Sequence, residues 1–276
     1  MQKNCFLLCT NSNKEFFENG LLITLKSLKL TNPHIPIVVF YDYLTSNQKN
    51  KLKDYELIKV NGSLFNSDHR PDLTTASYFR FYLSKIKDYD KIIYLDTDTV
   101  VLDNLDDVFK KKGNLIARGR KFQLCSEFRN VDKITKSEKI KEGNLLLNSG
   151  VLCFDKKFWV KRRILTQAMA LAEKYGWRNF KNNDQGMFNV LAYKYGGFTN
   201  LSKHYNFCKY DDMNQNDPEI RINSKGLKAP FINGKFVKVI HWNGESHLKP
   251  WNYDKNNMSL ENKRKYYYEC YTQFRD

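Results

Sequence analysis

Residues 91–101 constrain the chain most, because an apolar, β-branched run is interrupted there by two carboxylates, Asp96 and Asp98. Such a run predicts a buried strand. Side chains two positions apart on an extended chain point to the same side, so both aspartates can converge where the strand ends. Two carboxylates at one point favour a cation such as Mn²⁺, with Mg²⁺ as the alternative. A turn begun by the two aspartates is the simpler interpretation.

The pattern Asp-x-Asp-x-Val-Val after an apolar strand is typical of two enzyme classes. It resembles the nucleophile motif of haloacid-dehalogenase-like phosphatases, in which the first aspartate, here Asp96, is phosphorylated. It equally resembles the motif of nucleotide-sugar glycosyltransferases, in which the pair holds a metal on the donor diphosphate. Phosphatases of that type carry the motif on their first strand, whereas more than ninety residues precede it here. Its position therefore favours the glycosyltransferase.

The charge of the chain favours anionic partners. Its 276 residues include 46 Lys and Arg against 30 Asp and Glu, a net charge of +16, and 41% are hydrophobic, which is enough for a core. No zinc-finger spacing and no RNA-recognition signature accompanies the charge, so we expect no nucleic-acid partner. A non-catalytic nucleic-acid or sugar binder stays open as an alternative.

The cysteines and the hydropathy indicate where the protein works. Six cysteines form no Cys-x-x-Cys pair, and several lie inside apolar runs, as reduced core residues do. The first ten residues hold too short an apolar stretch for a signal peptide, and no run reaches 18 apolar residues. We expect a cytoplasmic protein.

Alternating elements in the first third of the chain predict a parallel sheet. We expect strands at 5–9, 36–40 and 57–60, and helices at 14–30 and from Thr45 to residue 53. Such alternation implies right-handed crossovers and one α/β domain with a Rossmann-like, mainly parallel sheet flanked by helices. Ligands bind at the carboxyl ends of such strands, where the loop 10–13 and the two aspartates both lie.

Further along, we expect a helix over 72–86 and a flexible connection over 110–142 that contains a strand at 115–117. We then expect a strand or strand pair over 145–154, helices over 156–175 and 182–191, and a strand over 236–241. Arg80 on the first of these helices is either a surface charge or a site residue. Asp184 and Gln185 lie in the first turn of a helix, where capping by Asn183 or Asp184 is the ordinary role.

The segment 241–251 combines three features of a phosphate-binding lid. His241 can ligate a cation, Gly244 lets the backbone approach a phosphate, and Lys249 supplies a positive charge before a proline. The acidic strand and this loop are complementary in charge.

These residues together resemble family 8 glycosyltransferases, the retaining group with the GT-A fold that includes bacterial lipopolysaccharide galactosyl- and glucosyltransferases and glycogenin. The resemblance extends from Leu8 to Trp251 and rests on four segments in the family's order. They are Tyr94-Leu95-Asp96-Thr97-Asp98, Asn148-Ser149-Gly150-Val151, Asp184-Gln185, and His241-x-x-Gly244 with Lys249-Pro250-Trp251.

The resemblance implies that Asp96, Asp98 and His241 ligate Mn²⁺ on the diphosphate of a UDP-hexose. It also implies donor contacts through Thr10 and Asn11 at the uridine, Thr97 beside the metal, Gly244 and Lys249 at the phosphates, and Arg80, Asn148, Asp184 and Gln185 at the sugar. The reaction would transfer glucose or galactose to a glycan or glycolipid with an α linkage. Gln185 would stabilise the sugar, and Asp184 is the fallback nucleophile if a covalent intermediate forms.

Residues 1–251 are expected to form the glycosyltransferase domain and residues 252–276 a basic, aromatic tail. The tail mixes cations with tyrosines, a composition that suits the headgroups of an anionic membrane at its inner face. The alternative is a terminal helix that packs its aromatic side chains on the domain.

Overall fold

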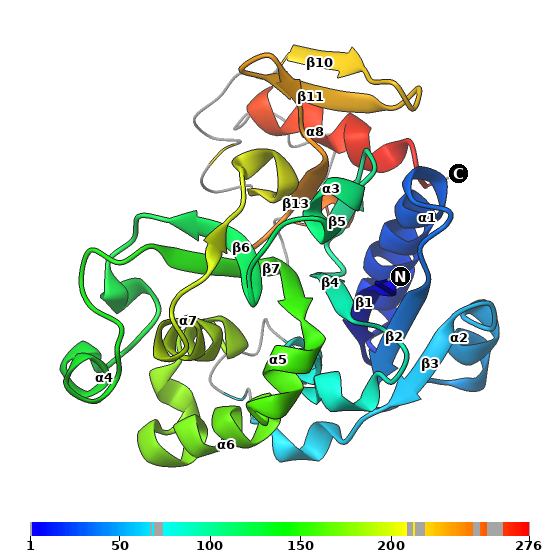
Figure 1. Cartoon of the computed structure of the whole chain (residues 1–276). Helices are drawn as coiled ribbons and strands as arrows, with labels where there is room; N and C mark the ends of the chain where they lie inside the picture. Colours follow the sequence, from blue (N-terminus) through cyan, green and yellow to red (C-terminus); the bar gives the residue numbers. More distant parts are fainter. Residues whose placement is uncertain are drawn as a thin grey trace.

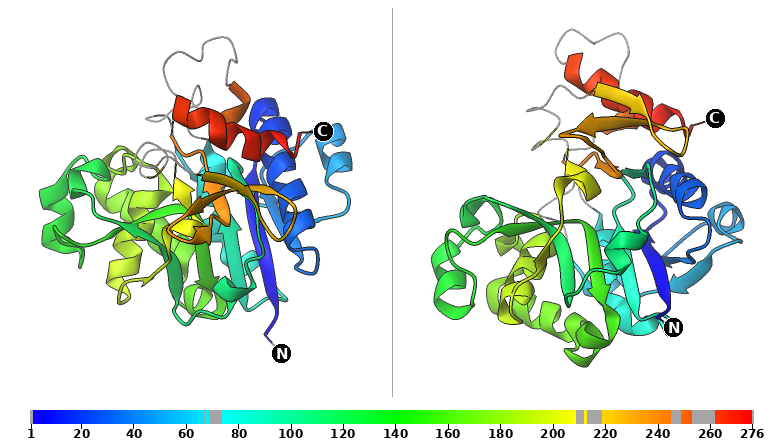
Figure 2. Two further views of the ribbon diagram at one scale, coloured as in Figure 1. Left: turned by 90° about the horizontal axis from the view of Figure 1, so that it is seen from above. Right: turned by 45° about the horizontal axis from the view of Figure 1, so that its top comes forward.

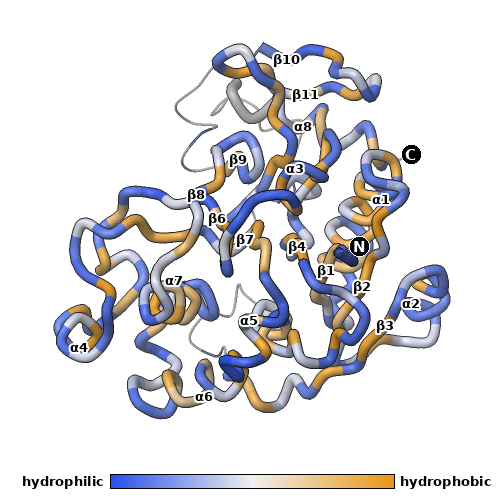
Figure 3. The backbone as a smooth tube through the Cα atoms, viewed as in Figure 1, coloured by the Kyte–Doolittle hydropathy of each residue, from blue (hydrophilic) through white to orange (hydrophobic). Residues whose placement is uncertain are grey.

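The computed structural model describes residues 2–66, 68, 74–208, 212, 219–244, 249–252 and 262–275, with the backbone alone for 262–266. A seven-stranded sheet lies at its centre, in the order β3-β2-β1-β4-β7-β6-β8 (Figure 1). Both faces of this sheet are buried, since Leu7 and Leu8 of β1 belong to two different apolar clusters. A strand buried on both faces needs a nearly continuous apolar sequence. The strand β2 is accordingly hydrophobic in Figure 3, whereas the surface helix α2 is hydrophilic.

The central sheet is mixed and mainly parallel, as the sequence predicts. Its strands are β1 (Asn4–Thr10), β2 (Ile37–Tyr41), β3 (Glu56–Lys59), β4 (Lys91–Leu95), β6 (Leu115–Arg120), β7 (Leu146–Asp155) and β8 (Thr199–Asn200). Strand β7 runs antiparallel to both of its neighbours, β4 and β6, while the other pairs are parallel. The carboxyl ends of β1 and β4 therefore meet at one edge of the sheet.

Helices and short helical turns connect and cover these strands. The α-helices are α1 (Leu22–Thr31), α2 (Ser46–Lys51), α3 (Asp106–Phe109), α4 (Val131–Ser137), α5 (Lys156–Lys161), α6 (Ile164–Tyr175), α7 (Asp184–Lys194) and α8 (Asn262–Thr272). A π-helical turn, η1 (Phe16–Leu21), precedes α1, and the 3₁₀ segments are η2 (Gly62–Leu64), η3 (Thr75–Lys85), η4 (Leu124–Ser126), η5 (Trp177–Asn179), η6 (Lys203–Tyr205) and η9 (Pro250–Asn252). Thr45 caps α2 as expected, accepting a hydrogen bond from the Gln48 amide. Among the described residues, every helix is too short or too polar to cross a bilayer.

Two small sheets and α8 form a second layer beside the central sheet (Figure 2). One sheet contains β5 (Thr99–Val101), β13 (Val239–His241) and β9 (Phe207–Cys208), and the other β10 (Glu219–Ile222), β11 (Lys228–Ile232) and β12 (Lys235–Phe236). The prediction of one strand over 236–241 is therefore wrong. The chain changes partner after Phe236, from β11 to β5, within one largely apolar stretch of sequence.

The carboxy-terminal helix packs against this layer. Tyr267, Tyr271 and Phe274 are buried with residues of β11 and β13, and Tyr271 donates a hydrogen bond to the Asn19 carbonyl. These three rings are thus inside the protein, as the alternative interpretation of the tail expected. Lys255 lies outside the described residues, and so do the side chains of Lys263, Arg264, Lys265 and Tyr266.

The segment 110–142 contains the predicted strand, but the rest of it is not the flexible connection that the sequence predicts. The segment continues as β6, η4 and α4, and it is held by buried apolar side chains at Leu124, Phe128, Ile134 and Ile140. These anchors are spaced singly among charged residues, so they produce no helical or strand period in the sequence.

Two predicted helices are interrupted. The helix over 156–175 is two helices, because Arg163 adopts a left-handed conformation with φ of 52° between α5 and α6. An arginine gives no sequence signal for that conformation. The helix over 72–86 is the 3₁₀ segment η3, with a kink at Tyr82; Asp72 and Leu73 lie outside the described residues.

Candidate active site

The two predicted aspartates lie in the short turn between β4 and β5, and neighbouring elements hold its backbone. The Asp96 amide donates to the Gly150 carbonyl over 2.9 Å, and the Trp242 amide donates to the Asp98 carbonyl over 3.0 Å. Thr24 of α1 donates to the Thr97 carbonyl over 3.1 Å. Two main-chain hydrogen bonds and one from the Thr24 side chain thus fix the backbone of this turn before any ligand binds.

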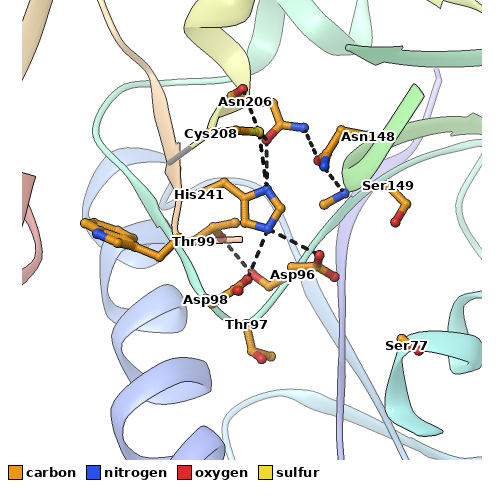
Figure 4. A network of polar contacts seen from close by, with 12 residues as sticks. Ser77, Asp96, Thr97, Asp98, Thr99, Asn148, Ser149, Asn206, Cys208 and His241 are labelled. Carbon is orange, nitrogen blue, oxygen red and sulfur yellow. Dashed lines mark hydrogen bonds and ion pairs between the residues drawn. The ribbon is translucent and has the colours of Figure 1, made fainter. Parts of the chain in front are cut away.

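His241 reaches the aspartates because β13 pairs with β5, in register with Thr99. Its Nε2 lies 3.5 Å from Asp96 Oδ2 and 3.3 Å from Asp98 Oδ1 (Figure 4). Ligand atoms of the three residues lie within 4.8 Å of one another. A Cβ at Gly150 would stand 2.0 Å from His241 Cε1, so only glycine leaves room for the ring. The predicted metal ligands therefore converge.

Protein cations balance the two carboxylates. Burial would raise the pKa of Asp98, but Lys249 and His241 hold it well below its usual value. Lys249 Nζ lies 2.5 Å from Asp98 Oδ2 and donates to the Trp242 carbonyl over 2.8 Å. Burial alone would lower the pKa of His241, but the two aspartates raise it well above its usual value. The ammonium group of Lys249 thus lies where the carboxylates attract a cation. The carboxylate oxygens of Asp96 and Asp98 and the imidazole nitrogen of His241 are a fitting donor set for Mn²⁺ or Mg²⁺.

Arg80 is a buried part of the site and not a surface charge. Only 1% of the residue is exposed. Its Nη2 donates to Asp96 Oδ1 over 3.1 Å, and its Nε lies 3.1 Å from Asp184 Oδ2. Its guanidinium group stacks on the Tyr94 ring, 3.8 Å from the ring centroid. Arg80 therefore connects the metal cluster to the start of α7.

The amide of Gln185 faces strand β7. Its Oε1 accepts hydrogen bonds from the Ser149 amide over 3.0 Å and from Asn148 Nδ2 over 3.3 Å. Its Nε2 donates to Glu127 Oε1 over 2.6 Å. Glu127 is buried, and the sequence does not predict it as a site residue, because it lies in the segment predicted as flexible. The apolar residues Leu124 and Phe128 beside it, which are buried, were the sequence signal that this segment packs into the core.

Asp184 lies at the first position of α7, as predicted. Burial raises its pKa to about 7, while Arg80 acts in the opposite direction. The preceding Asn183 has φ of 50° and makes no capping hydrogen bond, so the interpretation of this residue as a side-chain cap is wrong.

A cavity of about 440 Å³ contains most of the predicted site residues. Within the described part of the chain, the predicted residues that line it are Arg80, Asp96, Thr97, Asp98, Asn148, Asp184, Gln185, His241, Gly244 and Lys249. Thr10 and Asn11 are not among its lining residues, although the preceding Cys9 is. Thr10 is buried, and the Asn11 side chain accepts a hydrogen bond from the Asn13 amide. Contact of these two residues with a uridine stays a prediction.

The central sheet and the helices that cover it form the GT-A fold of glycosyltransferases. The galactosyltransferase LgtC, solved with donor and acceptor sugar analogues, superposes with a TM-score of 0.67 at 20% identity, covering 98% of this chain and 95% of that one. Residues 9–255 match the sequence profile of Glycosyl transferase family 8, so the chain belongs to this family. The GT-A fold expected from the sequence is confirmed. Family membership also disfavours the phosphatase alternative.

Relatives with similar sequences include a glycogenin and a streptococcal glycosyltransferase. Glycogenin-1 of Mus musculus is 28% identical over 189 residues, which are 68% of this chain and 45% of that protein. GlyB of Streptococcus pneumoniae is 24% identical over 264 residues, which are 91% of this chain and 59% of that protein. The chain thus spans about half the length of these two relatives.

Proposed function

We propose that the chain transfers a hexose, glucose or galactose, from a UDP-sugar to a glycan or glycolipid acceptor. Asp96, Asp98 and His241 would hold Mn²⁺, or alternatively Mg²⁺. The observation that carries the proposal is the convergence of these ligands, within 4.8 Å of one another, on the wall of a 440 Å³ cavity. Small-molecule sites commonly have volumes in this range.

On the metal side, the bound cation would neutralise charge that develops on the leaving diphosphate. Lys249 would move from Asp98 to the same phosphates, since its ammonium group has no carboxylate to balance once a cation occupies the site. Its contact with the Trp242 carbonyl keeps it within reach. Gly244 lies at the cavity with φ of 102°, a conformation that favours glycine and suits backbone contact with a phosphate.

On the sugar side, Gln185 and Asn148 would orient the hexose through hydrogen bonds. We propose retention of the α configuration by attack of the acceptor on the face that the diphosphate leaves. Two contacts support this route over a covalent intermediate. Asp184 is paired with Arg80, and Glu127 accepts a hydrogen bond from Gln185, so each carboxylate near the sugar is already engaged by a protein group. Asp184 remains the alternative nucleophile.

A screen of UDP-hexoses tests this function. The full chain is incubated with each UDP-hexose and with Mn²⁺, Mg²⁺ or EDTA, without acceptor, and released UDP is measured. We expect release with UDP-glucose or UDP-galactose and a loss of release in EDTA. NMR of a product made with an added acceptor should show an α linkage. Phosphate release from phosphomonoesters without UDP-sugar turnover would contradict the proposal.

Peripheral attachment to an anionic membrane at the cytoplasmic face stays a proposal for the tail. Because three of its rings are buried, the basic residues of the tail would provide the attraction to the anionic headgroups. Salt would weaken this electrostatic attraction. The matched test replaces Lys263, Arg264 and Lys265 with glutamate and keeps α8 in place. Wild type should sediment with anionic vesicles more than with neutral ones, and the variant should not; equal sedimentation of both proteins would refute attachment through these residues.

A further inference from the structure

The buried amide of Asn206 lies between the metal cluster and the sugar side of the cavity. It directly follows η6 and is completely buried. Its Oδ1 lies 3.0 Å from His241 Nδ1, and its Nδ2 donates to Asn148 Oδ1 over 2.8 Å. Figure 4 shows both contacts. One end of this amide therefore meets a proposed metal ligand, and the other end meets a proposed sugar contact.

The direction of these hydrogen bonds follows from groups that can act in only one way. The Gly150 amide can only donate, and it donates to Asn148 Oδ1 over 3.0 Å. The same oxygen faces Asn206, so Asn206 must present its NH₂ group there. Its carbonyl oxygen then points to His241, and Nδ1 of that ring must carry a hydrogen to make the bond.

A hydrogen on Nδ1 determines which nitrogen of His241 can bind a cation. The other nitrogen, Nε2, then keeps its lone pair when the ring is neutral. Nε2 is also the nitrogen that faces Asp96 and Asp98. Histidines that ligate metals are generally oriented by such a hydrogen bond from their second nitrogen.

We propose that Asn206 is a positioning residue that holds His241 in the tautomer and orientation needed for the cation, and that it links this orientation to Asn148. The proposal rests on the metal site of the proposed function. Asn206 is itself fixed, because Arg118 donates to its backbone carbonyl over 2.7 Å and forms an ion pair with Asp212.

The neighbouring thiol does not compete for this arrangement. Cys208 Sγ lies 3.8 Å from His241 Nδ1 and 3.2 Å from Asn206 Oδ1. The thiol can donate to the second lone pair of that oxygen while the imidazole uses the first. Both contacts thus agree with Asn206 Oδ1 as a shared acceptor.

Calorimetric titration of Mn²⁺ into the full chain tests the proposal without any turnover. Asn206→Ala should weaken Mn²⁺ binding about 10-fold or more, the usual effect of losing such a partner. Asn206→Asp keeps an acceptor toward His241 but loses the donor toward Asn148. We expect this variant to hold Mn²⁺ within about 3-fold of wild type while its KM for the UDP-hexose rises about 10-fold.

Asn189→Ala is the matched control, because Asn189 is an equally buried amide whose partners are the backbone of Leu147 and Gln185. It should destabilise the fold without changing Mn²⁺ affinity. Wild-type affinity in Asn206→Ala, or equal losses in both alanine variants, would overturn the role of Asn206. If Asn206→Ala does not fold, weak Mn²⁺ binding by Asn206→Asp would overturn it. A folded wild type that binds no Mn²⁺ would refute the proposed metal site itself.

Discussion

The two sides of the cavity are built from different interactions. The metal side gathers charges, with Asp96 and Asp98 facing Arg80, His241 and Lys249. The sugar side is a chain of amides, Asn206, Asn148 and Gln185, that ends at the carboxylate of Glu127.

Charges act at a distance, and several cations share the same carboxylates on the metal side. On the sugar side, each hydrogen bond between side-chain amides depends on one donor and one acceptor. The metal side should therefore fail when a ligand is removed. The sugar side should fail when an amide is free to turn.

The largest effect is expected from Asp98→Asn on the metal side. The substitution keeps the shape of the side chain but removes a charged ligand, so UDP-hexose turnover should fall by at least about 100-fold. The fold should stay intact, because the turn is held by its backbone, but the unfolding temperature should fall, because Lys249 loses its buried carboxylate partner. Turnover is measured as UDP release with Mn²⁺. Wild-type turnover that persists in EDTA would show that the metal side has no such role.

A smaller effect is expected from Glu127→Leu on the sugar side. The substitution removes the acceptor of Gln185 Nε2, leaves a buried donor unpaired and frees the amide to turn. A loss of about 2 kcal/mol in transition-state stabilisation would lower kcat roughly 30-fold. Mn²⁺ affinity should not change. Glu127→Gln is the matched control, because it keeps an acceptor oxygen and should retain most of the activity. An equal loss of Mn²⁺ binding in Glu127→Leu would mean that the two sides are not separate.

The smallest effect concerns Asp184, where the two sides meet. Burial raises its pKa from 3.8 to about 7, so the folded protein binds more protons than the unfolded chain between these values. Its contribution to the free energy of unfolding therefore falls as pH rises from about 4 to 7. Relative to Asp184→Asn, wild type should lose thermal stability between pH 5 and pH 8. A difference in unfolding temperature that is constant with pH would contradict the raised pKa.

The metal side was predictable from the sequence because its pattern is local. Asp96 and Asp98 are two residues apart in one short turn after β4, and His241 ends a strand of its own. The sugar side was only partly predictable. Asn148 and Gln185 were found through the family resemblance, whereas Glu127 and Asn206 lie in segments without periodic hydropathy. Their roles arise from side-chain contacts between distant parts of the chain, which no spacing along the sequence encodes.

The pairing of β13 with β5 also has a consequence for the order in which the protein matures. The two aspartates are synthesised long before His241, which enters the site only after most of the chain has left the ribosome. Contacts between such distant segments form late in folding, because a long loop must close first. The complete cation site therefore cannot serve as an early nucleus. A nascent chain that ends before β13 would carry the acidic pair without its imidazole ligand, and the cation would stabilise only the finished protein.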